Sequence, residues 1–426
     1  MQPARRVLVR NPPGASAVRS AVPGAYLPPQ RRLLSRSAPH HNAASVAPPA
    51  APSPSGLAPL PSRKLLSLRG PDAARFLQGV ITANLFPGHH GAPPPSDANN
   101  NARLRADAGF YAAFLTAQGR VLHDVFVYRD PRDVEGREHG HGTSWLIEVD
   151  AGEAERLQRH VKRYKLRAKF DVRILEEGEG QVWGAWGDGA GEVLGKGSEE
   201  GVVAVQDTRA PGLGWRVLGF GGKEPAELGD KVPRVGEDVY RLRRYLYGVP
   251  EGQGEILREQ ALTHESNIDL MGGVDFRKGC YVGQELTIRT EHRGVVRKRI
   301  LPCVLYPEEQ AEPKGLEYRP ELGGGLSAEM VPAEASIGRV GKKGRSAGKW
   351  LRGVGNVGLA LCRLEIMTDV VLPGEAASVA YTAGDEFVVG LGAKEGEEGE
   401  GDTRKVKIKA FVPEWLRQGL ENKEGH

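Results

Sequence analysis

The sequence gathers its most reactive residue types in one octapeptide, Lys278-Gly279-Cys280-Tyr281-Val282-Gly283-Gln284-Glu285. Cysteine acts as a nucleophile or a metal ligand in its thiolate form, and a nearby ammonium such as that of Lys278 stabilises a thiolate. Glycines at positions 279 and 283 let the backbone turn tightly or approach another group closely. The pattern predicts a loop that presents Cys280 as a working thiol. A buried structural cysteine in a tight turn is the alternative that the residue types alone leave open.

The other members of the octapeptide are expected to support the thiol. We expect Lys278 to tune the thiol or to meet an anion. Tyr281, Gln284 and Glu285 are expected to hold the loop in place by packing and hydrogen bonds. Gly279 and Gly283 would then shape the loop, and Cys280 would be the residue that does chemistry.

The cysteine count limits what else the chain can build. Only two cysteines accompany Cys280, namely Cys303 and Cys362, and the sequence has no C-x-x-C spacing. This number and spacing exclude a disulfide framework and a zinc site made of cysteines. Three reduced thiols are instead typical of a protein from a reducing compartment such as the mitochondrial matrix.

Hydrophobic patterning predicts the elements that carry the first part of the chain. Residues 65–68 form a short apolar strand, and Pro71 is a good first-turn residue for a helix whose apolar side chains, up to Ile81, share one face. Two strand-like runs, 111–115 and 121–128, flank a short turn and predict a hairpin. Residues 87–108, rich in Pro, Asn and Asp, are predicted to be an inserted loop.

The same patterning predicts three structural units after the N-terminus. A strand at 145–149 precedes a charged helix with Leu157, Val161 and Tyr164 on one face, and another strand ends near Ile174. This order of strand, helix and strand is typical of a ferredoxin-like α+β layer. A second such layer is predicted over residues 181–296, including a helix at 237–246. Short strands after Lys298, separated by polar loops, predict a small β-barrel.

The ends and the charge of the chain indicate its compartment and its partners. Residues 1–60 contain seven arginines, no lysine and no acidic residue, which is typical of an organelle presequence. Subtracting these seven charges from the net charge of +4 leaves −3, so the body lacks the basic surface of a nucleic-acid-binding protein. No run approaches the roughly 18 apolar residues that a membrane-spanning helix needs.

The octapeptide is similar to the K-G-C-Y-x-G-Q-E signature of the YgfZ-type proteins. These are relatives of the glycine-cleavage T-protein, a folate-dependent aminomethyltransferase. Further stretches resemble the family in the same order along residues 64–415: Arg69-Gly70-Pro71-Asp72, Phe76-Leu77-Gln78-Gly79 with Thr82, Gln118-Gly119-Arg120 leading to Asp124, Asp207-Thr208-Arg209, Leu213-Gly214-Trp215-Arg216, Gly248-Val249-Pro250-Glu251-Gly252, Glu265-Ser266-Asn267-Ile268-Asp269 and Gly358-Leu359-Ala360. With its presequence, the chain resembles the mitochondrial Iba/Caf-type branch of this family.

The resemblance implies a fold and a function. The fold would be α+β and T-protein-like, with two ferredoxin-like lobes and a C-terminal β-barrel around a central folate-sized opening. The function would be maturation of [4Fe–4S] proteins such as aconitase, lipoate synthase and biotin synthase in the mitochondrial matrix. The implied partners are an A-type iron–sulfur carrier and the [4Fe–4S] client enzymes, and the implied cofactor is tetrahydrofolate.

The sequence departs from the transferase pattern at two places. T-proteins end their first hairpin on paired aspartates that handle the folate amine, whereas this chain has His123-Asp124. We therefore favour a strand-end role for Asp124 over a folate-binding or catalytic one. The position of a pterin-holding glutamate falls on Leu246 or Tyr247. Aminomethyl transfer by a folate-dependent enzyme thus remains the alternative function, and an assembly factor without a conventional catalytic site is the preferred one.

An iron–sulfur cluster normally takes four protein thiolates, so Cys280 cannot hold one alone. We infer that Cys280 is one ligand of a cluster whose other ligands come from a partner. The expected domains are a presequence over residues 1–61, the two α+β lobes over 62–296, and the barrel with its long loops over 297–426.

Overall fold

Every residue described below belongs to one compact unit within residues 48–426. The computed structural model describes residues 53–85, 109–133, 143–195, 201–320, 326–342, 344–372, 381–391 and 404–424. Most of the predicted presequence and the whole predicted loop at 87–108 lie outside these ranges.

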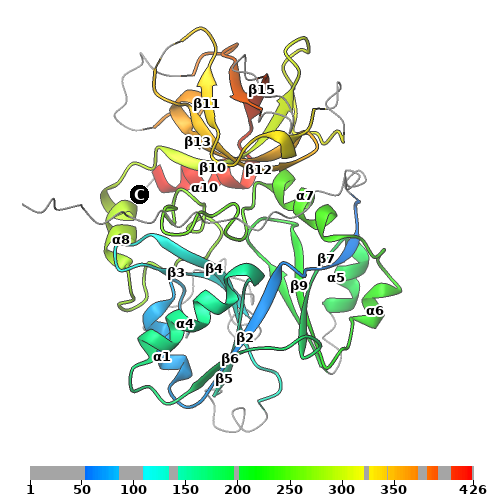
Figure 1. Cartoon of the computed structure of the whole chain (residues 1–426), viewed down its shortest axis with the longest axis vertical. Coiled ribbons are helices and arrows are strands. Elements are labelled where there is room, and N and C mark those ends of the chain that lie inside the picture. The colour runs from blue at the N-terminus through cyan, green and yellow to red at the C-terminus, as the bar shows by residue number, and fades with distance from the viewer. Residues whose placement is uncertain are drawn as a thin grey trace, which may run out of the picture. The chain divides into compact units, whose positions relative to one another are not determined.

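The first sheet has five antiparallel strands in the order β3-β4-β5-β2-β6. They are β2 (Arg63–Arg69), β3 (Phe110–Leu115), β4 (Val121–Arg129), β5 (Ser144–Asp150) and β6 (Asp171–Ile174). One face is covered by α1 (Ala73–Val80) and α4 (Ala154–Lys165), as Figure 1 shows. Leu77 of α1 and Leu157 of α4 are fully buried there, because each helix turns an apolar stripe toward the sheet. The predicted strands, helix and hairpin of this region are present.

One residue of the predicted apolar stripe on α4 does not join it. Leu157 and Val161 are buried, but Tyr164 is 38% exposed and stacks on His160 with ring centroids 4.4 Å apart. Tyr164 therefore lies on the surface and not in the core under α4. The next residue but one, Leu166, follows the helix with φ +49° and is exposed.

The second sheet has four antiparallel strands in the order β1-β7-β9-β8. They are β1 (Gly56–Pro59), β7 (Gly180–Trp186), β8 (Val202–Asp207) and β9 (Gly214–Phe220). The short helices α5 (Asp188–Leu194) and α6 (Ala226–Gly229) follow β7 and β9, and α5 packs on this sheet. The longer α7 (Glu237–Tyr247) ends at Gly248, which has φ +70°.

Strand β1 corrects the predicted boundary at residue 61. Residues 56–59 pair with β7 along their whole length, and the Leu57 side chain is fully buried. The low-complexity composition of residues 1–61 concealed this strand, because four residues are too few to show a period against a background of Ala and Pro. The folded body therefore begins before residue 56.

The inner faces of the two sheets share one hydrophobic core. Leu65 and Phe126 from the first sheet pack in the same cluster as Trp186 and Leu218 from the second. Tyr281, from the octapeptide, joins this cluster. The predicted α+β class with two lobes is confirmed, and the lobes are continuous with each other through this core.

The C-terminal part is a closed six-stranded barrel in the order β10-β13-β12-β11-β14-β15. Its strands are β10 (Lys298–Tyr306), β11 (Ser336–Arg339), β12 (Gly348–Val354), β13 (Val357–Arg363), β14 (Phe387–Gly390) and β15 (Lys405–Ala410). The short α9 (Leu364–Met367) follows β13, and α10 (Glu414–Glu424) ends the described chain. Pairing of β10 with β15 closes the barrel, as the sequence predicted.

Two helices join the barrel to the lobes. Leu242 and Tyr245 of α7 pack against β10, β12 and β13 in a shared cluster. Trp415 of α10 donates its indole N–H to the Tyr247 carbonyl at 2.9 Å. Helix α8 (Gln284–Arg293) begins with the last two residues of the octapeptide and leads into β10. Among the described residues, no helix combines the length and the apolar character needed to cross a membrane.

Candidate functional site

Cys280 is exposed, whereas Cys303 and Cys362 are buried in the barrel interior. The two buried sulfurs lie 3.8 Å apart and each contacts a carbonyl of its own strand. Burial raises the pKa of Cys303 well above its usual range, with Cys362 adding to the effect. Cys280 is therefore the one described cysteine that a partner protein can reach, and the alternative of a buried structural cysteine does not apply to it.

Lys278 points away from solvent and fastens the loop to the end of α1. Its Nζ donates to three carbonyl oxygens, those of Gln78, Ile81 and Ala83, at 2.8, 2.7 and 2.9 Å. The ammonium also lies 4.9 Å from the centre of the Tyr281 ring. Burial lowers the pKa of Lys278 to about 7, while Asp275 opposes the shift. All three ammonium donors are used by backbone acceptors, so the ammonium anchors the loop, a role that the sequence did not predict.

Gly283 is required by a close approach between two turns. It has φ +81°, and an added Cβ would lie 2.3 Å from the Thr116 carbonyl oxygen in the β3–β4 hairpin. Gly119 of that hairpin is equally crowded, because a Cβ there would lie 2.7 Å from Cβ of Leu286. A side chain at Gly279 would meet nothing within 4 Å, so packing does not require glycine there. Of the two roles expected for these glycines, a tight turn or a close approach, the close approach is present at Gly283 and not at Gly279.

Tyr281 and Gln284 hold the loop from inside. Tyr281 is 6% exposed, and burial raises its pKa to about 12. Its backbone N–H donates to Oε1 of Gln284 at 3.0 Å, while Val282 N–H donates to the Gly79 carbonyl at 3.0 Å. Glu285, in contrast, is exposed in the first turn of α8. These contacts of Lys278, Tyr281 and Val282 hold the loop in place, and Cys280 lies at its exposed tip.

Thr82 is a positioning residue to which the sequence assigned no role. Its hydroxyl donates to the Gly273 carbonyl at 2.5 Å and accepts from Ala113 N–H at 2.8 Å, and its carbonyl accepts from Asp275 N–H at 3.0 Å. Thr82 thereby ties the segment before the octapeptide to strand β3. A buried threonine just after a helix carries no periodic signal, so only the resemblance had marked it.

We predict that Lys278→Met will lower the free energy of unfolding by about 2 kcal/mol. The substitution keeps the length of the side chain but leaves three carbonyl oxygens without their charged donor. Urea unfolding measures the loss, and Lys349→Met is the matched control because its exposed pair with Glu334 contributes little. Equal stability of the two variants would contradict an anchoring role for Lys278.

Asp124 lies inside β4 rather than at a strand end, and its side chain is fully buried. Its two oxygens accept from Gly252 N–H at 3.1 and 3.2 Å, and Arg63 lies 3.5 Å away. Burial raises the pKa of Asp124 against the attraction of Arg63. The neighbouring His123 points to the other side and accepts from Arg258 at 2.8 Å, and burial lowers its pKa to about 3.

Asp124 belongs to a buried network of opposite charges between the two sheets. The members are Arg63, Arg209, Arg216, Arg244, Asp124, Glu148, Asp207, Glu251 and Glu255. Glu251 is central: it pairs with Arg209 at 2.8 Å and with Arg216. Burial alone would raise the pKa of Glu251, but Arg216, Arg209 and Arg244 hold it well below its usual range. Five of the nine members, Asp124, Asp207, Arg209, Arg216 and Glu251, lie in the stretches that carry the family resemblance.

One cavity at the network is small. It is lined by Arg63 and Glu251 of the network and by Gly252, and it has a volume of about 60 Å³. Small-molecule sites in proteins are usually about 300–1,000 Å³. Leu246 and Tyr247, at the position of the pterin-holding glutamate, offer no carboxylate, and Leu246 packs with the barrel cluster.

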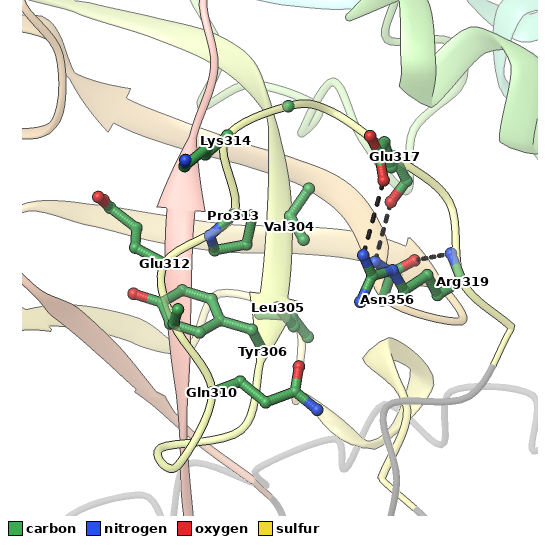
Figure 2. A pocket seen from close by; sticks show the side chains of 12 residues that line it. Val304, Leu305, Tyr306, Gln310, Glu312, Pro313, Lys314, Glu317, Arg319 and Asn356 are labelled. Carbon is green, nitrogen blue, oxygen red and sulfur yellow. Dashed lines mark hydrogen bonds and ion pairs between the residues drawn. The ribbon is translucent and has the colours of Figure 1, made fainter.

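Two larger cavities involve the barrel. One of about 550 Å³ lies between β10 and the loop that follows it, where Figure 2 shows Tyr306, Glu312 and Lys314 among the lining side chains. Another of about 360 Å³ lies between residues 257–266 and the barrel strands. Neither is lined by a cysteine or by a residue of the octapeptide.

One group of potential metal ligands is already satisfied by protein contacts. Ligand atoms of His264, Asp269 and Glu291 lie within 4.8 Å of one another. His264 Nε2 is 3.0 Å from Glu291, and Arg299 pairs with both oxygens of Asp269 at 2.9 and 3.0 Å. The guanidinium of Arg299 occupies the Asp269 carboxylate and competes there with any metal cation. We therefore interpret the group as a structural contact between α8, which carries Glu291, and β10, which carries Arg299.

Comparison with known proteins gives close relatives over the whole chain. A protein of Chaetomium globosum is 59% identical over the full length of both chains, and one of Pyricularia oryzae is 55% identical over 86% of each. A third, from Neurospora crassa, is 51% identical over 85% of this chain and 81% of its own. All three bear the name iron–sulfur cluster assembly factor IBA57 homolog, mitochondrial.

Comparisons of domains and structures agree with the fold described above. Residues 297–418 match the family model for the CAF17 C-terminal β-barrel domain. The crystal structure of a glycine cleavage system aminomethyltransferase T from Bartonella henselae matches with a TM-score of 0.55. It covers 86% of this chain and 88% of that protein at 13% identity, which supports a shared fold alone. On the sequence identities, the chain belongs to the family of mitochondrial iron–sulfur cluster assembly factor IBA57 homologs.

Proposed function

We propose that this protein is a mitochondrial matrix factor for the maturation of [4Fe–4S] proteins, working with an A-type iron–sulfur carrier through Cys280. The names of the relatives support the process and the organelle. The clients suggested by the family resemblance are aconitase and the radical enzymes that make lipoate and biotin. The observation that carries the proposal is the exposed thiol at the tip of an anchored loop.

The anchored loop supports a ligand role better than a catalytic one. No described histidine or carboxylate makes a hydrogen bond to Cys280, so the thiol lacks the adjacent base of a nucleophilic enzyme within the described part of the chain. A metal ligand needs only access and a fixed direction. Cys280 has both, because Lys278, Tyr281 and Gln284 immobilise the backbone on either side of it.

A shared cluster follows from counting ligands. A cluster with four thiolate ligands needs three more than the single exposed cysteine described here, and the buried pair in the barrel cannot reach a partner. The cluster is thus cargo, held between Cys280 and thiolates of the carrier and passed on by exchange of one thiolate for another. Each exchange replaces one iron–sulfur bond by another and requires no redox step.

Anaerobic cluster reconstitution tests this proposal. The chain is mixed with an A-type carrier, ferrous iron and sulfide, and the complex is isolated by size exclusion and examined by visible absorption. We expect a cluster spectrum in a heterocomplex that forms only when both proteins are present. A cluster that stays entirely on the carrier, with no heterocomplex, would contradict the proposal.

The second candidate, a folate-dependent one-carbon transferase, requires a pterin near Asp124. The described residues do not fit that group, because both oxygens of Asp124 are bonded within the protein and the adjacent cavity measures about 60 Å³. A pterin would have to displace part of the charge network. We therefore infer that the assembly role does not use tetrahydrofolate at this place.

We predict that tetrahydrofolate at about 1 mM will leave the melting temperature unchanged within about 1 °C. A ligand present at 100 times its Kd would stabilise the fold by about 2.7 kcal/mol, which is readily detected. Thermal unfolding under anaerobic conditions measures the effect, with a folate-binding T-protein as the positive control. A clear rise in melting temperature would restore the transferase candidate and make Asp124→Asn the next variant to test.

A further inference from the structure

The end of α4 carries a dense group of unpaired positive charges. Residues 156–169 contain seven lysines and arginines and no acidic residue. The first two, Arg156 and Arg159, pair with Glu153 and Glu155. Those near the helix end, namely Lys162, Arg163, Arg167 and Lys169, are exposed and form no ion pair with the described residues. We call residues 162–169 the basic tip.

An apolar side chain projects from the centre of the basic tip. Leu166 is 87% exposed, more than any other large hydrophobic residue described. Its backbone has φ +49° and ψ −110°, values that glycine adopts readily and a leucine rarely does. Tyr164 lies beside it, 38% exposed. Leu166 therefore does not stabilise the fold, because its side chain is exposed and its backbone conformation is unfavourable.

The basic tip is held firmly by the body behind it. Lys169 N–H donates to Oδ2 of Asp72 at 2.7 Å, and Phe170 is buried in the core under α1 and α4. Lys165 lies over the Phe170 ring at 5.1 Å. The basic tip is therefore attached to the folded body at its C-terminal end, close in sequence to the exposed Leu166.

We propose that the basic tip docks the protein onto an anionic phospholipid bilayer. Leu166 would insert between the acyl chains at the interface, while the four unpaired cations would bind headgroup phosphates. Charge complementarity favours an anionic surface, and the 87% exposure of Leu166 favours a bilayer, because a bilayer accepts an exposed leucine without a preformed socket. This inference is independent of the chemistry proposed for Cys280.

We expect the basic tip to bind the anionic bilayer with moderate affinity and reversibly. Each lysine or arginine near an anionic bilayer raises affinity by about fivefold, equivalent to about 1 kcal/mol. Burial of the leucine side chain adds about tenfold or more. Such docking would concentrate the protein at a membrane surface without any spanning segment, and it would weaken as salt screens the charges.

Flotation with vesicles tests the role of Leu166. The full chain is mixed at about 0.1 M salt with vesicles of phosphatidylcholine containing about 30% phosphatidylglycerol, or with phosphatidylcholine alone. We expect Leu166→Gly to reduce binding to the anionic vesicles by about tenfold, with a melting temperature equal to or above that of the parent. Val371→Gly is the matched control, since Val371 is 81% exposed on the barrel part of the chain, and it should bind like the parent.

A charge-reversal pair tests the cations. Because residues 1–60 also carry seven arginines, the decisive comparison is between variants of the same full chain. We expect Lys162→Glu/Arg167→Glu to reduce binding by at least about 25-fold, and Lys314→Glu/Arg345→Glu, which changes exposed cations elsewhere, to reduce it far less. Equal binding by the two double variants, or unchanged binding by Leu166→Gly, would overturn the proposal. Tip variants that bind vesicles normally but lose the A-type carrier would instead assign the tip to a protein partner.

Discussion

Cys280→Ser is expected to abolish the cluster-bridged complex with the carrier, lowering its yield by at least about 10-fold. Serine keeps the size of the side chain but supplies a hydroxyl in place of the thiolate that iron–sulfur clusters require. Because Cys280 is exposed at the loop tip, the substitution should leave the melting temperature unchanged. The loss would therefore report on ligation alone. Visible absorption of the isolated heterocomplex, together with its iron content, measures the effect.

The buried cysteines provide the matched controls. Cys303→Ala and Cys362→Ala each remove a thiol from the barrel interior, far below the surface, and should keep the cluster yield per folded molecule. Aconitase activity in cells that lack the endogenous factor gives an independent readout for all three variants. A Cys280→Ser variant that formed the coloured complex and restored aconitase would remove the thiol from the mechanism, and the protein would then act as a scaffold.

Glu251→Gln is expected to give the largest loss of stability, about 3–5 kcal/mol, or roughly 5–8 °C in melting temperature. The substitution keeps the shape of the side chain but removes its negative charge. Arg209 and Arg216 would then remain buried without the carboxylate that both of them contact. Tyr240, whose hydroxyl lies 3.3 Å from Glu251, would lose an acceptor of full charge. Thermal and urea unfolding measure the change.

The pH dependence of this difference follows from the pKa of Glu251. The arginines hold this pKa well below that of an unfolded glutamate, so the unfolded state takes up a proton first as pH falls. The stabilisation by Glu251 is thus complete above about pH 4.5 and is lost progressively as pH falls below that value toward the folded pKa. The difference in the free energy of unfolding between the parent and Glu251→Gln should become smaller as the pH falls from about 5 to about 3. Burial and, to a smaller extent, the charge of Glu251 raise the pKa of Asp124. Asp124 therefore acts in the opposite sense, and its contribution is smaller in Glu251→Gln than in the parent.

An exposed glutamate separates the network from general surface electrostatics. Glu155 pairs with Arg159 on the surface of α4, and both side chains are more than half exposed. Glu155→Gln should leave the melting temperature unchanged. The difference in the free energy of unfolding between this variant and the parent should not vary with pH. If Glu251→Gln behaved in the same way, the buried charges would contribute nothing to holding the two lobes together.

Local patterns in the sequence were sufficient for most elements of the fold. Apolar patterns predicted a strand at 65–68, a helix over 71–81 and a helix at 237–246. These ranges match β2, α1 and α7, because side chains facing a core repeat at the period of the element. The same reasoning missed β1, which is four residues long, and it placed Tyr164 in a core that ends one turn earlier. Short elements and sheet edges are set by the neighbouring segments and not by their own period.

The same distinction between local sequence patterns and long-range contacts applies to the candidate site. The octapeptide alone marked Cys280, since its residue types and glycines are local information. The partners of Lys278 lie 195–200 residues away in sequence, at the end of α1, and no local pattern predicts a contact of that separation. For that reason the sequence predicted that the ammonium would tune the thiol or meet an anion, whereas in the folded chain it donates to three carbonyl oxygens.

What the sequence determined by itself was the choice of Cys280 as the candidate thiol, the α+β class with its terminal barrel, and the family. The tertiary structure alone decided that Cys280 is accessible while Cys303 and Cys362 are not, and that Asp124 is enclosed by Arg63 and Gly252. It alone showed Leu166 projecting into solvent. The physical reason is that burial and charge pairing depend on which distant segments meet, and those meetings exist only once both sheets and the barrel have packed.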